Sequence, residues 1–139
     1  MANYTSKKGT LSYPSITLFD RLTDLSGLLS SLPEDKRNYV TLEDDKIKVE
    51  YAGFSMSVRL KEKIPFNLVV YEGAEGAPFH FTVTFHLDPA EMPGETVFWI
   101  EADADLNFMM RSLLSGKIQE GLDKVVDAVV SGQVPYSND

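Results

Sequence analysis

The stretch that decides the fold is NFMMRSLLSGKIQEGLDKVVDAVV, residues 107–130. Its apolar residues recur at intervals of three and four, which is the spacing of one face of an α-helix. These residues are Met109, Met110, Leu113, Leu114, Ile118, Leu122, Val125, Val126, Val129 and Val130. The sequence therefore predicts a long closing helix with one apolar face, and Asn107 is expected to cap its first turn.

A different period precedes this helix. Apolar and polar residues alternate between Lys46 and Asp103, as in FHFTVTFHL at residues 79–87, and successive side chains of a strand point to opposite faces. We predict a first strand at residues 4–12 and six more at residues 39–43, 46–51, 54–61, 67–72, 79–87 and 95–103. An antiparallel sheet with one apolar face follows, and the long helix covers that face.

Two short helices are expected between the first and second strands. Ser15, after Pro14, is the expected N-cap of the first helix. Asp24 would cap the second helix, residues 25–32, which ends at Pro33 because proline disfavours helical geometry in the residue before it. Gly73 and Gly76 lie between two predicted strands and therefore indicate a hairpin loop, since a phosphate-binding loop would be followed by a helix.

Composition limits the classes of protein that fit. The chain has 139 residues, a net charge of −8 and no cysteine, which indicates one domain over residues 1–139 without disulfides or thiolate metal sites. No apolar run approaches the roughly 20 residues that span a bilayer, and the polar N-terminus has no apolar segment of a secretory signal. A cytoplasmic location is therefore expected. Nucleic acid is not an expected partner, because the acidic surface as a whole would repel phosphate backbones, and it would likewise repel anionic lipid headgroups.

Short motifs add a family resemblance. They are Tyr13-Pro14-Ser15, Leu22-Thr23-Asp24-Leu25, Leu32-Pro33-Glu34-Asp35-Lys36, Gly76-Ala77-Pro78-Phe79 and Ala104-Asp105-Leu106-Asn107. With the order of elements, they resemble small bacterial members of the START-like (Bet v 1-like, SRPBCC) superfamily. The resemblance implies an α+β helix-grip fold, in which a curved antiparallel seven-stranded sheet, with two short helices after strand one, holds a long C-terminal helix on its concave face. In many members an apolar ligand binds between sheet and helix.

We therefore predict a binding module for an apolar or amphipathic small molecule. The expected cavity residues come from the inward faces of the strands and from the long helix: Tyr51, Phe54, Met56, Phe81, Phe85, Phe98, Met109, Met110 and Leu113. The competing interpretation is that these side chains only fill the interior, because protein cores pack densely. Gly116 and Gly121 either make room for a ligand or a close approach to the sheet, or mark a tolerated kink.

Two alternatives remain open. Other START-like members are cyclases, hydroxynitrile-type or ring-cleaving enzymes, and Tyr51 is the ionisable side chain that strand parity places inside. Still others activate chaperone ATPases. Strand alternation places the Trp99 side chain on the outer face, where it marks either a dimer or partner surface or a site covered by a loop. No catalytic residue, cofactor or metal is predicted.

The polar face carries the remaining titratable candidates. His80 and His86 share it and are expected to face solvent. Glu101, Asp103 and Asp105 also line this face. Their carboxylates would hold a hard cation only with further oxygen ligands, and two of them, Asp103 and Asp105, equally well complement the start of the long helix.

Overall fold

The computed structural model describes residues 2–25, 38–43, 46–51, 54–74 and 76–137. The strands are β1 (Ala2–Thr5), β2 (Gly9–Leu11), β3 (Val40–Glu43), β4 (Lys46–Tyr51), β5 (Phe54–Ile64), β6 (Leu68–Gly73), β7 (Phe81–Pro89) and β8 (Thr96–Ala104). The helices are α1 (Ser15–Thr23) and α4 (Phe108–Ser137). Within the described residues, no helix is long and apolar enough to cross a bilayer.

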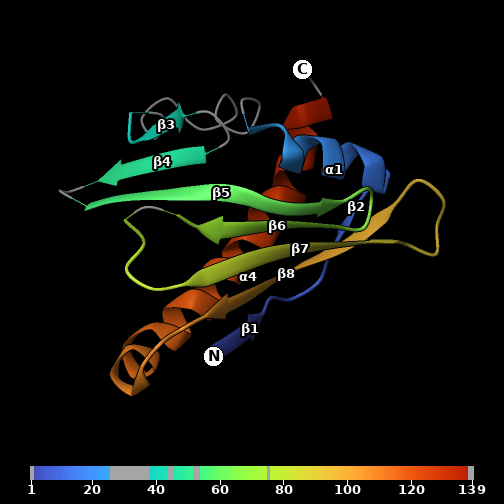
Figure 1. Ribbon diagram of the computed structural model, residues 1–139. Helices are drawn as coiled ribbons and strands as arrows, with labels where there is room; N and C mark the ends of the chain where they lie inside the picture. Colours follow the sequence, from blue (N-terminus) through green and yellow to red (C-terminus); the bar gives the residue numbers. More distant parts are fainter. Residues whose placement is uncertain (1, 26–37, 44–45, 52–53, 75, 138–139) are drawn as a thin grey trace.

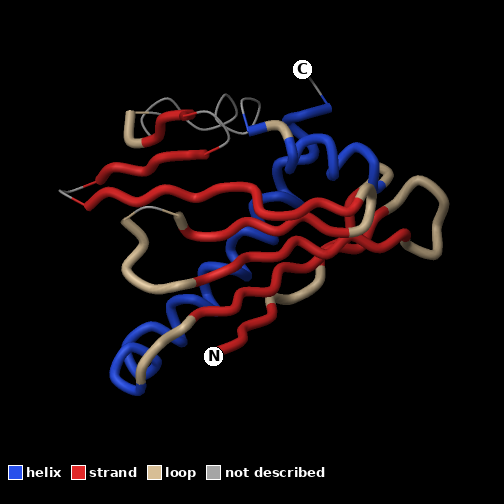
Figure 2. The backbone as a smooth tube through the Cα atoms, viewed as in Figure 1, coloured by secondary structure: helices blue, strands red, loops and turns tan. Residues whose placement is uncertain are grey.

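The strands form one antiparallel sheet in the order β1-β8-β7-β6-β5-β4-β3, and β2 also pairs with β8. The sheet is curved, and α4 crosses one of its faces from end to end (Figures 1 and 2). This confirms the predicted helix-grip fold. The second short helix predicted at residues 25–32 falls almost entirely outside the described residues.

The first strand is not continuous, which corrects the prediction of one strand over residues 4–12. Thr5 pairs with Glu101 and Gly9 with Phe98, so the register shifts by one residue between β1 and β2. Buried Ser6 causes the break, because its hydroxyl accepts the Ile100 N–H at 2.8 Å and donates to the Lys7 carbonyl at 2.8 Å. The extra residue is a β-bulge, which bends a strand and disrupts its ladder.

The bulge is also where α4 is attached to the sheet. Gln119 Nε2 donates to the Thr5 carbonyl at 2.8 Å, and the Lys7 N–H donates to Asp123 Oδ1 at 2.7 Å. Both backbone groups are available because the regular ladder is interrupted there. The middle of α4 is therefore held by side-chain bonds to the junction of β1 and β2.

The two predicted helix caps had different outcomes. Asn107 Oδ1 accepts the Met110 N–H at 2.8 Å, which confirms Asn107 as the cap of α4. The predicted Ser15 cap is wrong: Pro14 is the N-cap residue, in extended geometry and without a side-chain bond. Ser15 is already helical, and its hydroxyl lies 3.4 Å from that of buried Thr96.

The packed core fills one end of the space between sheet and helices. Its buried members are Leu11, Leu18, Phe19, Leu22, Val69, Tyr71, Leu87, Phe98, Ile100 and Val126. Tyr71 donates its hydroxyl proton to the Leu22 carbonyl and so ties β6 to α1. Burial raises the pKa of Tyr71, so this phenol keeps its proton above the pH at which an exposed tyrosine ionises.

Gly9 sets the distance between α4 and this end of the sheet. A Cβ atom at Gly9 would lie 2.8 Å from Val126 Cγ1 and 2.9 Å from atoms of Phe98 and Val130. Valine side chains are stiff and the Phe98 ring is fully buried, so none of them can easily move away. Gly116 is the opposite case, because a Cβ there meets nothing within 4 Å.

We expect Gly9→Ala to lower the free energy of unfolding by about 1–3 kcal/mol, because it overpacks a full core. The matched change Gly116→Ala should raise it by about 0.5–1 kcal/mol, because alanine restricts the unfolded chain and fits the helix. Urea unfolding of both variants checks this. Equal effects of the two substitutions would contradict the close approach at Gly9.

Candidate functional site

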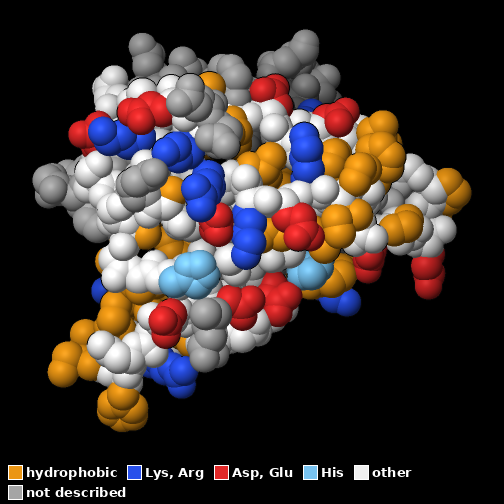
Figure 3. Space-filling model, in the orientation of Figure 1, with side chains coloured by type: hydrophobic (Ala, Val, Ile, Leu, Met, Phe, Trp, Pro, Cys, Tyr) orange, Lys and Arg blue, Asp and Glu red, His pale blue; other side chains and the backbone are white. Residues whose placement is uncertain are grey.

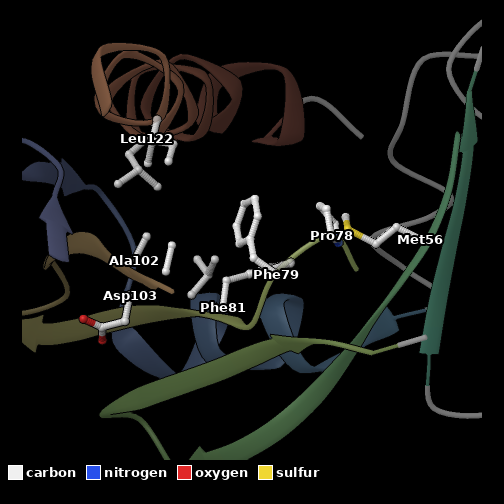
Figure 4. Close-up of a pocket in the computed structure, with 10 residues that line it drawn as sticks. Met56, Pro78, Phe79, Phe81, Ala102, Asp103 and Leu122 are labelled. Atoms are coloured by element: carbon white, nitrogen blue, oxygen red, sulfur yellow. The ribbon is translucent and has the colours of Figure 1, made fainter. Parts of the chain in front are cut away.

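A cavity of about 340 Å³ lies between the sheet and α4, next to the packed core. Its walls come from β5, the loop before β7, β7, β8 and α4 (Figure 4). The lining residues are Met56, Pro78, Phe79, Phe81, Val83, Ala102, Asp103, Ala104, Ile118 and Leu122. The wall is therefore almost wholly aliphatic and aromatic.

The register between β7 and β8 explains why a cavity forms here. Phe81 pairs with Ala104 and Val83 with Ala102, and all four residues line the cavity. The next two inward pairs along the same strands belong to the packed core instead. They are Phe85 with Ile100 and Leu87 with Phe98. β8 thus changes from large to small inward side chains, and the space left by the alanines is the cavity.

The helical wall consists of Ile118 and Leu122, which are four residues apart and share one face of α4. One further turn along, Val126 enters the core. Near the start of α4, the hydroxyl groups of Tyr4 and Ser115 are hydrogen-bonded at 2.7 Å. Tyr4 lies opposite Ala102 on the inner face, so its phenol bridges sheet and helix.

Phe79 stands in the space between the sheet and α4 (Figure 4). It precedes β7, in a loop whose turn uses Gly76 at a φ of 83°. Its ring centroid lies 5.9 Å from that of Phe81 in an edge-to-face arrangement. Gly73 makes room for the Phe81 ring, because a Cβ there would lie 2.6 Å from a Phe81 ring atom. The two hairpin glycines therefore help to place the aromatic wall.

Asp103 is the one ionisable residue among the described lining residues, but its carboxylate points away from the cavity (Figure 4). Asp103 Oδ1 accepts a hydrogen bond from Asn3 Nδ2 at 2.7 Å on the outer face of the sheet. The cavity thus takes the apolar part of a molecule without presenting a carboxylate to it.

The structure separates the cavity residues predicted from the sequence. Met56 and Phe81 line the cavity. Phe98 is fully buried in the core, and Phe85 packs against that core with its ring edge-to-face with Tyr71. The side chains of Tyr51 and Phe54 lie outside what the structure describes.

The predicted residues of α4 do not line this cavity. Met109 and Leu113 are 70% and 66% exposed, and Met110 is half-buried without contributing to the wall. The physical reason is that the first turns of α4 project beyond the edge of the sheet (Figure 1). Gly116 and Gly121 also give no close approach, because a Cβ at either position meets open space.

Several lining residues were missing from the predicted set. Val83, Ala102 and Ala104 have inward parity, and Ile118 and Leu122 lie on the apolar face of the helix. The sequence period therefore predicts that all five point inward. The predicted set lacks the two alanines, although their small side chains are what leave a space. Pro78 lies in a loop without any periodic signal.

The outer face carries a connected polar and aromatic group. The rings of His86 and Trp99 are stacked with centroids 5.0 Å apart, and Lys8 Nζ lies 5.0 Å from the Trp99 centroid. His86 Nε2 is 2.9 Å from Glu101 Oε1. Trp99 does lie outside the core, as predicted, but it is half-buried by these neighbours. His86 is likewise half-buried on this face, whereas His80 is exposed.

Glu101 and Asp103 both accept hydrogen bonds from the Asn3 amide, at 2.8 and 2.7 Å. The bonds from Asn3 and then from His86 hold the pKa of Glu101 below its usual range. Asp105 lies beyond the end of β8 and is exposed. Across the described ranges, no three histidine, cysteine or acidic side chains are grouped so that they could hold a metal ion.

Comparison with known proteins supports the fold. No family model and no curated protein matches the sequence. A START superfamily protein from Mycobacterium smegmatis is 15% identical, with a TM-score of 0.61 over 93% of this chain and 97% of its own. The XoxI protein of Bacillus cereus is 12% identical, with a TM-score of 0.67 over 99% of each chain.

An Aha1 protein from Colwellia psychrerythraea, solved as a dimer, is also similar. It is 14% identical, with a TM-score of 0.58 over 88% of this chain and 97% of its own. At these identities the likeness is one of fold. The chain therefore has the START-like helix-grip fold over nearly its whole length.

We expect Asn3→Ala to raise the pKa of Glu101 toward its ordinary value, because it removes the main bond to the carboxylate. A carboxyl group whose pKa is lower in the folded chain than in the unfolded chain stabilises the fold at pH values above its ordinary pKa. This stabilisation is lost as the pH falls through the lowered pKa. The loss of stability in Asn3→Ala should therefore be larger at pH 7 than at about pH 3. An NMR titration of the Glu101 carboxyl and urea unfolding at both pH values check this, with the exposed outer-face change Thr10→Ala as control.

Proposed function

We propose that this protein binds a small apolar or amphipathic molecule in the cavity between its sheet and α4. The observation that carries the proposal is the pair of alanines, Ala102 and Ala104, which face Val83 and Phe81 and leave about 340 Å³ of space beside a fully packed core. Ligand pockets commonly measure about 300–1,000 Å³, so this cavity suits a small ligand.

The chemistry of the wall indicates which part of a ligand it accepts. A ligand that buries about 200 Å² of apolar surface gains about 5 kcal/mol before the entropic cost of binding. Phe79 and Phe81 offer ring faces and edges, and the Met56 thioether is flexible and polarizable. This wall favours an aromatic or branched hydrocarbon group whose polar part, if it has one, stays outside.

The cyclase-like alternative needs an acid or base directed at the bound molecule. Two described tyrosines of the sheet face the interior. Tyr71 belongs to the core, its hydroxyl bonds to the Leu22 carbonyl, and burial raises its pKa. The Tyr4 hydroxyl is hydrogen-bonded to that of Ser115, and Tyr4 is not among the lining residues of the cavity. Asp103 turns to the outer face. The described residues therefore favour binding over acid–base chemistry at this cavity.

The partner-binding alternative was based on an exposed Trp99. Stacking by His86 and the cation of Lys8 cover much of this indole, which serves the local packing of the outer face. The likeness to a protein solved as a dimer suggests that such folds can self-associate. Nothing among the described residues assigns a dimer interface to Trp99.

Filling the cavity tests the proposal. In Ala102→Leu the longer side chain should occupy the ligand's space and weaken binding of the neutral fluorophore aminoanthracene by about tenfold or more, equivalent to about 1.4 kcal/mol. The matched control Ala128→Leu adds the same atoms at an exposed position of α4 and should leave binding unchanged. Fluorescence titration measures both affinities.

A second variant guards against misfolding. Ile118→Phe fills the cavity from the helical side, so both filling variants should weaken uptake while circular dichroism and urea unfolding report an intact fold. Wild-type affinity in both folded variants would overturn the cavity as the binding site.

A further inference from the structure

The first turns of α4 expose three large apolar side chains that the fold does not use. Phe108 is 86% exposed, Met109 70% and Leu113 66%. We call these three residues the α4 tip. The tip projects beyond the sheet, and apolar atoms dominate the corresponding end of the molecular surface (Figures 1 and 3).

The tip is held in a defined conformation. Asn107 caps the helix through the Met110 N–H, and Ser112 Oγ donates to the Phe108 carbonyl at 3.2 Å. Met109 and Leu113 are four residues apart and so share one face of the helix, with Phe108 beside them. Together the three side chains expose on the order of 400 Å² of apolar surface. This is comparable with the largest apolar patch of a typical monomeric protein, which is often functional.

The helix segment that carries the tip has only positively charged side chains, although exposed Asp105 lies just before it in the chain. Residues 106–119 contain Arg111 and Lys117 and neither aspartate nor glutamate, whereas the chain carries a net charge of −8. Both cations are exposed. An apolar helical surface flanked by Arg and Lys is the composition that binds at the interface of membranes with anionic lipids.

Area and shape decide between a lipid surface and a second copy of the chain. A standard protein interface buries about 800 Å² on each partner, roughly twice what the tip offers. The tip is also convex and projecting, so a rigid partner would need a matching socket, whereas a lipid headgroup layer deforms around it. We propose that the α4 tip inserts into the interfacial layer of membranes that contain anionic lipids.

The α4 tip is a surface separate from the ligand cavity. The acidic body of the protein is repelled by an anionic bilayer, so contact is confined to the tip and its two cations. Attachment is then reversible, and the attraction of the two exposed cations to the headgroups weakens with increasing salt, since charges separated by more than about 10 Å are largely screened at 0.1 M salt.

Vesicle flotation tests the proposal. The full chain should float with vesicles of equal parts phosphatidylcholine and phosphatidylglycerol, and less with phosphatidylcholine alone. The double variant Phe108→Ser/Leu113→Ser should bind the mixed vesicles at least about tenfold more weakly. Arg111→Gln/Lys117→Gln should reduce binding to the mixed vesicles and leave binding to phosphatidylcholine alone unchanged.

Met92→Ser is the matched control, because Met92 is 64% exposed in the loop between β7 and β8, away from the tip. It should bind the mixed vesicles like the wild type. The proposal is overturned by absence of wild-type flotation, or by equal loss in Met92→Ser and the tip variant. It is also overturned if the wild type forms a dimer that the tip variant does not form. Binding to polyglutamate, an anionic polymer without a lipid layer, together with no binding to vesicles would overturn it as well.

Aminoanthracene uptake should be the same in the wild type and in the Phe108→Ser/Leu113→Ser variant. Failure of vesicle binding with normal uptake would therefore overturn the membrane surface alone. Failure of uptake in the wild type would count against the cavity and leave the result of the flotation experiment intact.

Discussion

The attachment of α4 to the bulge in the first strand is the constraint on which the rest of the structure depends. One extra residue between β1 and β2 interrupts the ladder, and the side chains of Gln119 and Asp123 bond to the Thr5 carbonyl and the Lys7 N–H there. Beyond this point Gly9 lets α4 approach the sheet closely at Val126. The helix is thus fixed at its middle and packed tightly on one side of that fixed point.

The two ends of the interior differ because of this attachment. On the Gly9 side, Phe98 and Ile100 of β8 fill the space below α4, and the core is dense. On the other side β8 presents Ala102 and Ala104, and the Tyr4 phenol reaches Ser115 to connect sheet and helix. Close packing on one side allows an open space on the other, since hydrophobic burial at the core supplies stability that the cavity does not.

Periodicity predicted the fold because it reports which face a side chain lies on, and the helix-grip architecture follows from faces. It does not report how far along a strand the filled interior extends. Phe81 and Phe85 share inward parity on β7, and only their partners on β8, Ala104 and Ile100, separate the cavity residue from the residue packed on the core. The break at Ser6 was equally unreadable, because it depends on a hydroxyl that bonds across to Ile100, 94 positions along the chain.

The start of α4 lies away from the cavity for a related reason. The helical period continues through Met109 and Leu113, and a sequence pattern cannot show that the sheet ends before them. Side chains at this exposure lose little contact with water when the chain folds, so the hydrophobic effect gives them little part in stability. The apolar run of α4 is longer than the sheet that it covers. The part of α4 that lies over the sheet builds the core and the cavity wall. The part that projects beyond the sheet is available for contact with another apolar phase.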